Sequence, residues 1–427
     1  MVIRRFTLAV LATVAVISTH VSDAAAQNKN TRQAPSIDAL IQSMVNYHPY
    51  VRAINEGNYQ AAAELEIARS SFDPFIEQKT SSRVSGYYDG TNLTQRFSNP
   101  FEDFNGSVYT EYRISDGDFP VYEADYETLS GGEASVGIAI SLLKNRELDK
   151  RRTELANAGL ATSQWQALAT SLINDFVYKG VSEYVAWYES ALQVNAVTEL
   201  LNTATERERA LVTRVEKGDL ANVVLTEFKA NILQQRLLLA ELKQKRDAHA
   251  QMLSFYWRSP KGDMLIVDEA NPPKDINWPF WVGNGQLMTL RNALRNHPEL
   301  DVMKLEQQVV NNKAALASNA LLPKLDLKAS VARDIGSGPS NLDGTETKVG
   351  LSFSYPLGNR KAKAEQAQLQ SKQRELEHKL TSTEQAITQR FEQALVYWGQ
   401  AKDIVALQSE NAALAKTLSK VEKTRFD

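Results

Sequence analysis

The chain has no cysteine among its 427 residues, and it has only five histidines and six methionines. Without cysteine there is no disulfide, no thiol catalysis, no thiolate metal ligand and no lipid anchor on an N-terminal cysteine. The few histidines and methionines make a poor ligand set for a transition metal. We therefore expect no metal site and no other cofactor.

Recognisable catalytic motifs are missing as well. The sequence contains no glycine-rich phosphate loop, no Gly-x-Ser-x-Gly elbow and no His-Glu-x-x-His motif. An acidic stretch that begins at Asp116 lacks the ligand spacing of a calcium loop, which favours a solvated loop over a calcium site. The prediction is that the protein is not an enzyme.

Neither sign of charge is in large excess. Lys and Arg total 48 against 51 Asp and Glu, which gives a formal net charge of −3. This balance provides no basic surface for nucleic acid, so we expect no nucleic-acid partner.

Long apolar runs are also scarce. The run at residues 6–17 follows Arg4 and Arg5 and precedes three alanines that end at Ala26. This pattern is typical of a secretory signal peptide, residues 1–26, and a membrane anchor is the weaker alternative because the run is shorter than about 18 residues. No later run is long enough to span a bilayer as a helix, so insertion of the mature protein would require strands closed into a barrel.

The most informative positive feature is a duplication. His48-Pro49 and His297-Pro298 each stand at the same distance before a second proline, Pro74 and Pro323 respectively. A repeat of this size predicts a fold of two similar halves. Each histidine could bind a metal, but the proline after it marks a helix break, so a structural role is the better interpretation.

In the first half, helical periodicity starts after Ser36, a candidate N-cap, and continues to about residue 71 with a break at His48-Pro49. Strand alternation follows, weakly in residues 75–88 and clearly in residues 133–143. Ala134, Val136, Ile138, Ile140 and Leu142 lie on one side of the second strand, with small or polar residues on the other. The region between is turn-rich, and we interpret residues 91–131 as one enlarged external loop.

A helix without proline is predicted from Arg146 to about Glu216. Two rows of apolar residues at seven-residue spacing indicate a coiled-coil helix with two packing neighbours. Lys217-Gly218-Asp219 forms a turn, and a second helix with a heptad seam covers residues 221–256. These two helices should form an antiparallel hairpin with its tip near Gly218.

The second half repeats this order. We predict a helix to about Leu322, strands at residues 324–333 and 348–355, and another long helix after Asn359-Arg360. The predicted domains are the signal peptide 1–26, a first repeat 27–258, a connector 259–285 and a second, incomplete repeat 286–427. Because no returning helix follows the last one, we expect the natural protein to continue beyond this sequence.

Together these segments resemble the TolC family of outer-membrane efflux proteins. The resemblance covers about residues 36–427 and rests on residues 297–300, 321–327 and 349–357 and on the hairpin tip, residues 214–225. It implies a mainly α fold with membrane β structure, in a homotrimer. Each protomer would give two strand pairs, four strands in all, to one shared β-barrel in the outer membrane, and its coiled-coil hairpins would form an α-barrel across the periplasm.

The function that the resemblance implies is an exit duct for efflux of small molecules or for type I secretion. Its partners would be a second and third copy, an inner-membrane transporter, a periplasmic adaptor and outer-membrane lipid. The adaptor would dock at the hairpin tip, on Arg214, Lys217, Gly218 and Glu227. The helix–strand transitions would lie at Pro74, Pro323 and Pro356. Val224 stands where the family often has an aspartate, which leaves a charge-held gate at this tip in doubt.

Two other functions remain open at this point. A periplasmic coiled-coil adaptor also has long helical hairpins, but the paired strands in each half argue against it. A structural coiled-coil protein without a pore would not need the alternating segments at residues 134–142 and 349–355.

Overall fold

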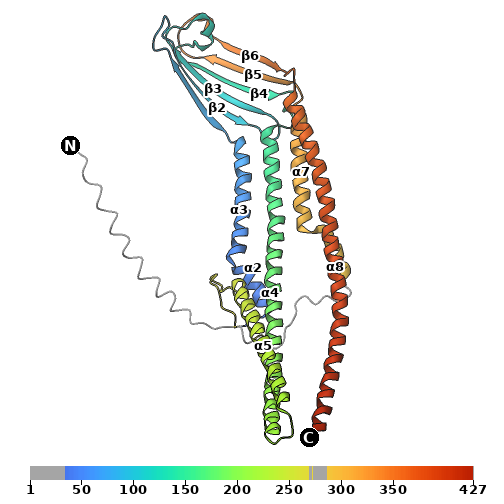
Figure 1. Cartoon of the computed structure of the whole chain (residues 1–427). Coiled ribbons are helices and arrows are strands. Elements are labelled where there is room, and N and C mark those ends of the chain that lie inside the picture. The colour runs from blue at the N-terminus through green and yellow to red at the C-terminus, as the bar shows by residue number, and fades with distance from the viewer. Residues whose placement is uncertain (1–33, 269–271, 273–285, 427) are drawn as a thin grey trace, which may run out of the picture. The chain divides into compact units, whose positions relative to one another are not determined.

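The computed structural model describes residues 34–268, 272 and 286–426 (Figure 1). The predicted signal peptide and most of the predicted connector lie outside these residues. The chain divides into two compact units, one made of Met1–Asn55 and Leu172–Trp281 and the other of Glu56–Ser171 and Val282–Asp427. These units cut across the two sequence repeats because the helices α3 (Pro49–Arg69) and α4 (Lys150–Glu216) each run from one unit into the other. The repeat boundaries therefore remain a prediction.

A six-stranded antiparallel sheet dominates the second unit (Figure 1). The strands pair with their neighbours in sequence order, so each connection is a hairpin or, between β4 and β5, a long excursion through helices. The strands are β1 (Phe75–Ser82), β2 (Thr91–Pro100), β3 (Gly106–Asp116), β4 (Glu133–Ser141), β5 (Lys324–Asp334) and β6 (Thr345–Ser354).

Two predictions about the strands were wrong. The sheet has six strands where four were expected. Residues 91–131 do not form one loop. They contain β2 and β3 followed by a shorter connection to β4. The β2 sequence is mostly polar, with Leu93 and Phe97 as its large apolar residues, so its composition resembles that of a loop. Pairing on both sides stabilises it as a strand, since the preference for a strand depends strongly on its neighbours. The alternation of Val108, Tyr112 and Ile114 in β3 was a usable signal.

Helices continue from the sheet in the same unit. The helices α3, α4, α7 (Pro298–Asn319) and α8 (Arg360–Phe426) lie in that order, and a short helix α6 (Gln286–Ala293) precedes α7. Thr162 of α4 donates to the carbonyl of Ala61 in α3 at 3.4 Å, and Asn312 of α7 donates to Asn157 of α4 at 3.0 Å. On α8, Gln373 donates to Asn311 of α7 at 2.8 Å. Two packing neighbours were predicted for the first long helix, and α4 has them.

The other unit contains α2 (Ile37–Tyr47), the start of α3, the remainder of α4 and α5 (Asn222–Tyr256). The predicted N-cap is confirmed, since Ser36 Oγ accepts the amide of Ala39 at 3.2 Å. Leu40, Met44, Trp187 and Leu253 are fully buried and form the centre of the core. This apolar cluster joins α2 to both arms of the hairpin.

The hairpin of α4 and α5 is antiparallel, as predicted. His249 Nδ1 and Glu183 Oε2 lie 2.9 Å apart, and the guanidinium of Arg207 lies 5.7 Å from the ring centroid of Phe228. Both contacts join residues on opposite sides of Gly218 at similar distances along the chain. The predicted start of the first long helix was too early, since α4 begins at Lys150 after a turn. None of the helices in the described residues is both long and apolar enough to cross a membrane.

Candidate membrane sheet and docking tip

The two faces of the sheet differ in chemistry. Ile76 lies opposite Phe97, and Val136 opposite Val331, so large apolar side chains align across several strands. Many are exposed, with 75% of Ile76 and 67% of Phe353 accessible. An apolar band of this kind, alternating with polar residues along each strand, is typical of a lipid-facing surface. This apolar face carries Leu93, Phe97, Val108, Val136, Ile138, Ile140, Leu327, Val331, Val349, Leu351 and Phe353.

The opposite side is a charged face. Arg113 and Glu133 are direct cross-strand partners with 2.9 Å between Nη2 and Oε2, and Arg96 and Glu111 are partners at 3.4 Å. Acidic and basic side chains are equal in number on this face, so they cancel in net charge. They are Glu77, Glu111, Glu133, Asp326, Asp334 and Glu346 against Lys79, Arg96, Arg113, Lys324, Lys328 and Lys348. A polar face opposite an apolar one is what a strand needs when lipid lies on one side and water on the other.

The transition from β4 into α4 is held by Asp149 and Arg152. The Arg152 amide donates to Asp149 Oδ1 at 3.1 Å, so Asp149 caps the helix. The Arg152 guanidinium donates to Asp149 Oδ2 and to the carbonyls of Asn145 and Arg146. Only 13% of the Arg152 side chain and 7% of the Asp149 side chain are exposed. Sequence reasoning missed this pair, although an aspartate just before a long helix is an N-cap signal.

The predicted transition prolines do lie between helices and strands. Pro74 directly precedes β1, Pro323 directly precedes β5, and Pro356 lies between β6 and α8. The carbonyl of Pro323 accepts the amide of Lys144 at 3.1 Å, so the pairing of β4 with β5 continues past the end of the sheet. A proline loses only an amide donor, which is tolerated at a strand's first residues.

Two asparagines precede the long helices in the two repeats. Asn145 has φ of 69° and Asn359 has φ of 41°, and each is followed by an arginine. Asparagine is one of the few residues that enter this left-handed region at low cost. The sequence echo between Asn145-Arg146 and Asn359-Arg360 therefore has a conformational cause.

At the hairpin tip, α4 ends in a Schellman motif. Gly218 has φ of +76°, its amide donates to the carbonyl of Val215 at 3.0 Å, and the amide of Asp219 donates to Arg214 at 2.9 Å. This arrangement satisfies the last carbonyls of the helix and needs a residue that adopts positive φ. Helix α5 then begins at Asn222, and its N-cap residue, Ala221, makes no side-chain capping hydrogen bond.

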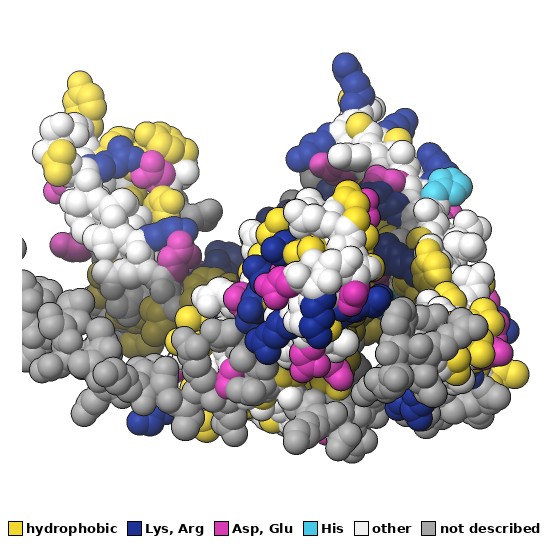
Figure 2. Space-filling model, turned by 60° about the horizontal axis from the view of Figure 1, so that its bottom comes forward, with side chains coloured by type: hydrophobic (Ala, Val, Ile, Leu, Met, Phe, Trp, Pro, Cys, Tyr) yellow, Lys and Arg dark blue, Asp and Glu magenta, His cyan; other side chains and the backbone are white. Residues whose placement is uncertain are grey.

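The four residues predicted for docking are all exposed, three of them at the end of α4 and Glu227 in the second turn of α5. Val224, which stands in place of an aspartate, is 38% exposed. The hairpin end comes forward in Figure 2, where acidic and basic side chains are interspersed without one sign dominating. This mixed surface suits polar contacts with a protein partner more than an anionic polymer.

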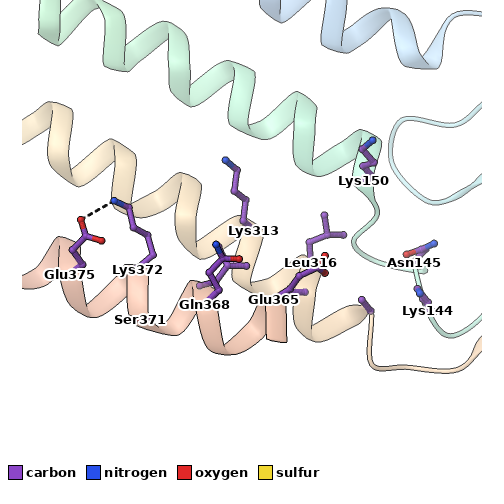
Figure 3. Close-up of a pocket in the computed structure, with 13 residues that line it drawn as sticks. Lys144, Asn145, Lys150, Lys313, Leu316, Glu365, Gln368, Ser371, Lys372 and Glu375 are labelled. Carbon is purple, nitrogen blue, oxygen red and sulfur yellow. Dashed lines mark hydrogen bonds and ion pairs between the residues drawn. The ribbon is translucent and has the colours of Figure 1, made fainter. Parts of the chain in front are cut away.

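A groove of about 790 Å³ lies among α7, α8 and the start of α4 (Figure 3). Lys144, Lys150, Lys313 and Lys372 line it together with acidic residues of α8. Lys372 is 3.1 Å from Glu375, and hydrogen bonds from Lys379 and then Lys372 lower the pKa of the Glu375 carboxyl. These mutual ion pairs are typical of a solvated helix surface. Within the described residues, no three His, Asp or Glu side chains are placed to hold a metal ion.

With this geometry established, residues 289–427 match the family model of outer membrane efflux proteins. This part of the chain is therefore an outer membrane efflux protein domain. The resemblance drawn from the sequence is confirmed, and with it efflux as the function and the outer membrane as the location. The alternatives, an adaptor or a structural protein without a pore, gain no support. The family consists of efflux proteins, in line with the expectation that the chain is not an enzyme.

Solved structures extend the likeness of fold to most of the chain. CusC, studied for its folding and transmembrane channel formation, gives a TM-score of 0.56 with 14% identity over 91% of this chain and 82% of that chain. A membrane protein from Pseudomonas aeruginosa gives 0.53 with 14% identity over 83% and 74%. The outer membrane protein VceC from Vibrio cholerae gives 0.51 with 11% identity over 82% and 75%. No curated protein matches the chain. The predicted fold class is confirmed, with six strands in place of four.

Proposed function

We propose that this efflux protein is one subunit of a homotrimeric exit duct in the outer membrane. Solutes enter at the helical tips, move along a helical tube and leave through a barrel closed by three sheets. The observation that carries the proposal is the sheet with one charged and one apolar face, continued by four helices that lie side by side.

The open ends of this wall support a ring of copies. Every residue of β1 and of β6 is exposed, and these two strands form opposite edges of the sheet. Among the wall helices, α3 and α8 are likewise at opposite ends. Because the two ends are different surfaces, one copy joins the next head to tail, and such contacts form a ring when the rotation between copies closes. Closure also removes the unpaired backbone groups of the edge strands, which lipid cannot satisfy.

The proposed partners are those that the family resemblance implies. An inner-membrane transporter supplies the energy for transport, and the chain itself has no nucleotide-binding loop. A periplasmic adaptor joins the two, docking at the tip on Arg214, Lys217, Gly218 and Glu227. Outer-membrane lipid covers the apolar face. The cargo is small molecules for efflux or a polypeptide for type I secretion.

Two measurements test the proposal. After washing with alkaline carbonate, the native protein should stay in the outer-membrane pellet, and release into the supernatant would refute membrane insertion. Deletion of its gene should raise the intracellular accumulation of a fluorescent efflux dye or abolish secretion of a type I substrate. Restoration by the wild-type gene is the control, and unchanged accumulation and secretion would refute the transport role.

A further inference from the structure

The added strands β2 and β3 are full members of the sheet. They pair with each other from Thr91↔Asp116 to Pro100↔Ser107, and β1 and β4 flank them over nearly their whole length. Their side chains also continue both faces. Phe97 and Val108 lie on the apolar face, while Arg96 and Glu111 lie on the charged face. A β2–β3 hairpin outside the membrane would not need to alternate apolar and charged residues in register with the neighbouring strands.

Both ends of this hairpin are fixed to the rest of the unit. At its β2–β3 turn, Asn105 donates to Ser141 Oγ at 3.2 Å, and the carbonyl of Asp103 accepts a hydrogen bond from Arg152 at 3.0 Å. At the other end, the amide of Asp118 donates to Asp89 Oδ1 at 2.9 Å, which ties the β3–β4 connection to the β1–β2 connection. The turn thus lies at the same level as the start of α4, where the sheet gives way to helices.

The width of the sheet matches the width of the helical wall. Strands about 4.8 Å apart and tilted by about 40° take up roughly 6.3 Å each along a barrel wall, so six span about 38 Å. Four helices packed about 9.5 Å apart also span about 38 Å. Four strands would span only about 25 Å on the same basis. Six strands therefore let the wall pass from helix to sheet without narrowing.

We propose that the closed barrel has eighteen strands, six from each copy, and a bore as wide as the helical tube that leads to it. This inference rests on the homotrimer proposed above. Eighteen strands give a backbone diameter of about 36 Å, against about 24 Å for twelve, and barrels of 16 to 18 strands enclose an open aqueous channel. A barrel as wide as the tube does not select cargo by size any further than the tube does. Because the charged face has no net charge, the barrel does not select cargo by the sign of its charge either.

Single cysteines test whether β2 and β3 belong to the membrane wall, because the natural chain has none. Thr94→Cys and Ser107→Cys lie on the charged face, and Gln95→Cys and Val108→Cys are their matched neighbours on the apolar face. In intact outer membranes, a water-soluble maleimide should label the first two, and only a lipid-soluble maleimide should label the other two. All four should react after denaturation. Equal labelling of all four by the water-soluble reagent in membranes would overturn the eighteen-strand barrel.

A second experiment separates that failure from a failure of the duct itself. Gln78→Cys in β1 is combined, one at a time, with Thr347→Cys, Val349→Cys or Leu351→Cys in β6, all on the same face. Oxidation should produce a covalent trimer for one of these pairs. If a covalent trimer forms but the water-soluble maleimide labels both positions of β2, 94 and 95, the protein is a duct with a narrower barrel. The absence of any covalent trimer, with release by carbonate, would refute the duct. A cryo-electron microscopy map of the full-length trimer then counts the strands, and twelve would overturn the inference.

Discussion

His48 and His297 make the same hydrogen bond in the two repeats. His48 Nδ1 accepts the amide of Tyr50 at 3.1 Å, and His297 Nδ1 accepts the amide of Glu299 at 3.3 Å. Each imidazole thus satisfies a free amide at the start of a helix whose first residue is proline. The repeated His-Pro pair is a helix-starting device, which confirms the structural role predicted for both histidines.

His48 should make stability depend on pH. Its Nδ1 accepts an N–H, so its Nε2 carries the proton that is donated to the Phe255 carbonyl at 3.0 Å. Burial lowers the pKa of His48 below its usual value of 6.5, the hydrogen bond to Phe255 opposes this, and Arg258 adds to the lowering. With the folded pKa below the unfolded pKa, this contribution to stability is present above pH 6.5 and is lost as the pH falls through the folded pKa.

We therefore expect the free energy of unfolding of the detergent-solubilised protein to decline between pH 7.5 and pH 5. His48→Gln should flatten this decline while lowering stability at pH 7.5, because the cap at Nδ1 is lost. His297→Gln is the control and should keep the pH dependence. Equal pH profiles for the wild type and His48→Gln would contradict the assignment.

Gly218→Val should disturb docking without disturbing assembly. A Cβ at this position meets no atom within 4 Å, so the change causes no clash, but φ of +76° strains a β-branched residue. The strain, about 1–2 kcal/mol, falls on the tip alone. We expect a normal SDS-resistant trimer with several-fold less adaptor recovered by co-purification and reduced export. Gly218→Asn, which tolerates this φ, is the matched control, and full docking by Gly218→Val would count against the tip.

Removing one partner of the Arg113–Glu133 pair should destabilise the sheet. Both side chains are nearly buried, 15% and 11% exposed, so Arg113→Gln leaves a carboxylate without its cation. The cost should be about 3 kcal/mol, and Arg113→Gln with Glu133→Gln together should cost less than the single change. Lys79→Gln breaks a pair that is 74% and 46% exposed, and it should cost less than about 1 kcal/mol. Urea unfolding of the trimer measures the wild type and these three variants, and a double variant that loses more stability than Arg113→Gln alone would refute the coupling.

Asn145 tests the conformational demand at the helix entry. Asn145→Ala should lower stability by about 1 kcal/mol because alanine adopts positive φ poorly, whereas Asn145→Gly should be close to neutral. Both variants keep the backbone amide of residue 145, which donates a hydrogen bond to Asn319 Oδ1 at 2.8 Å. The temperature at which the trimer dissociates is measured for both variants and for the wild type. Equal losses in both variants would assign the effect to the side chain of Asn145.

The sequence predicts local structure in this chain better than lateral packing. Heptad spacing locates α4 and α5, and the turn glycine locates the tip at Gly218. The order of the wall helices could not be predicted, because contacts such as Asn157 with Asn312 join residues far apart in sequence. The β2 strand was missed for a similar reason. Its polar residues are stabilised by β1 and β3 on either side, and no periodicity within residues 91–100 reports these neighbours.

The candidate sites divide in the same way. The prolines and the tip residues carry local signals, so their places in the fold were predicted correctly, whereas docking at the tip stays a prediction. The cross-strand pair Arg113–Glu133 and the cap formed by Asp149 and Arg152 depend on register and on side-chain reach. The Arg113–Glu133 pair is not visible until the strands are paired, whereas Asp149 carries an N-cap signal in the sequence itself.

The exposed edges of β1 and β6 also bear on how the protein reaches its membrane. A lone copy has a row of backbone donors and acceptors on each edge strand, and the hydrocarbon interior offers them no partner. Entry into the bilayer and association of the copies are then one event rather than two in succession. Biogenesis should accordingly slow steeply as the supply of protomers falls, and an unassembled protomer should stay outside the bilayer.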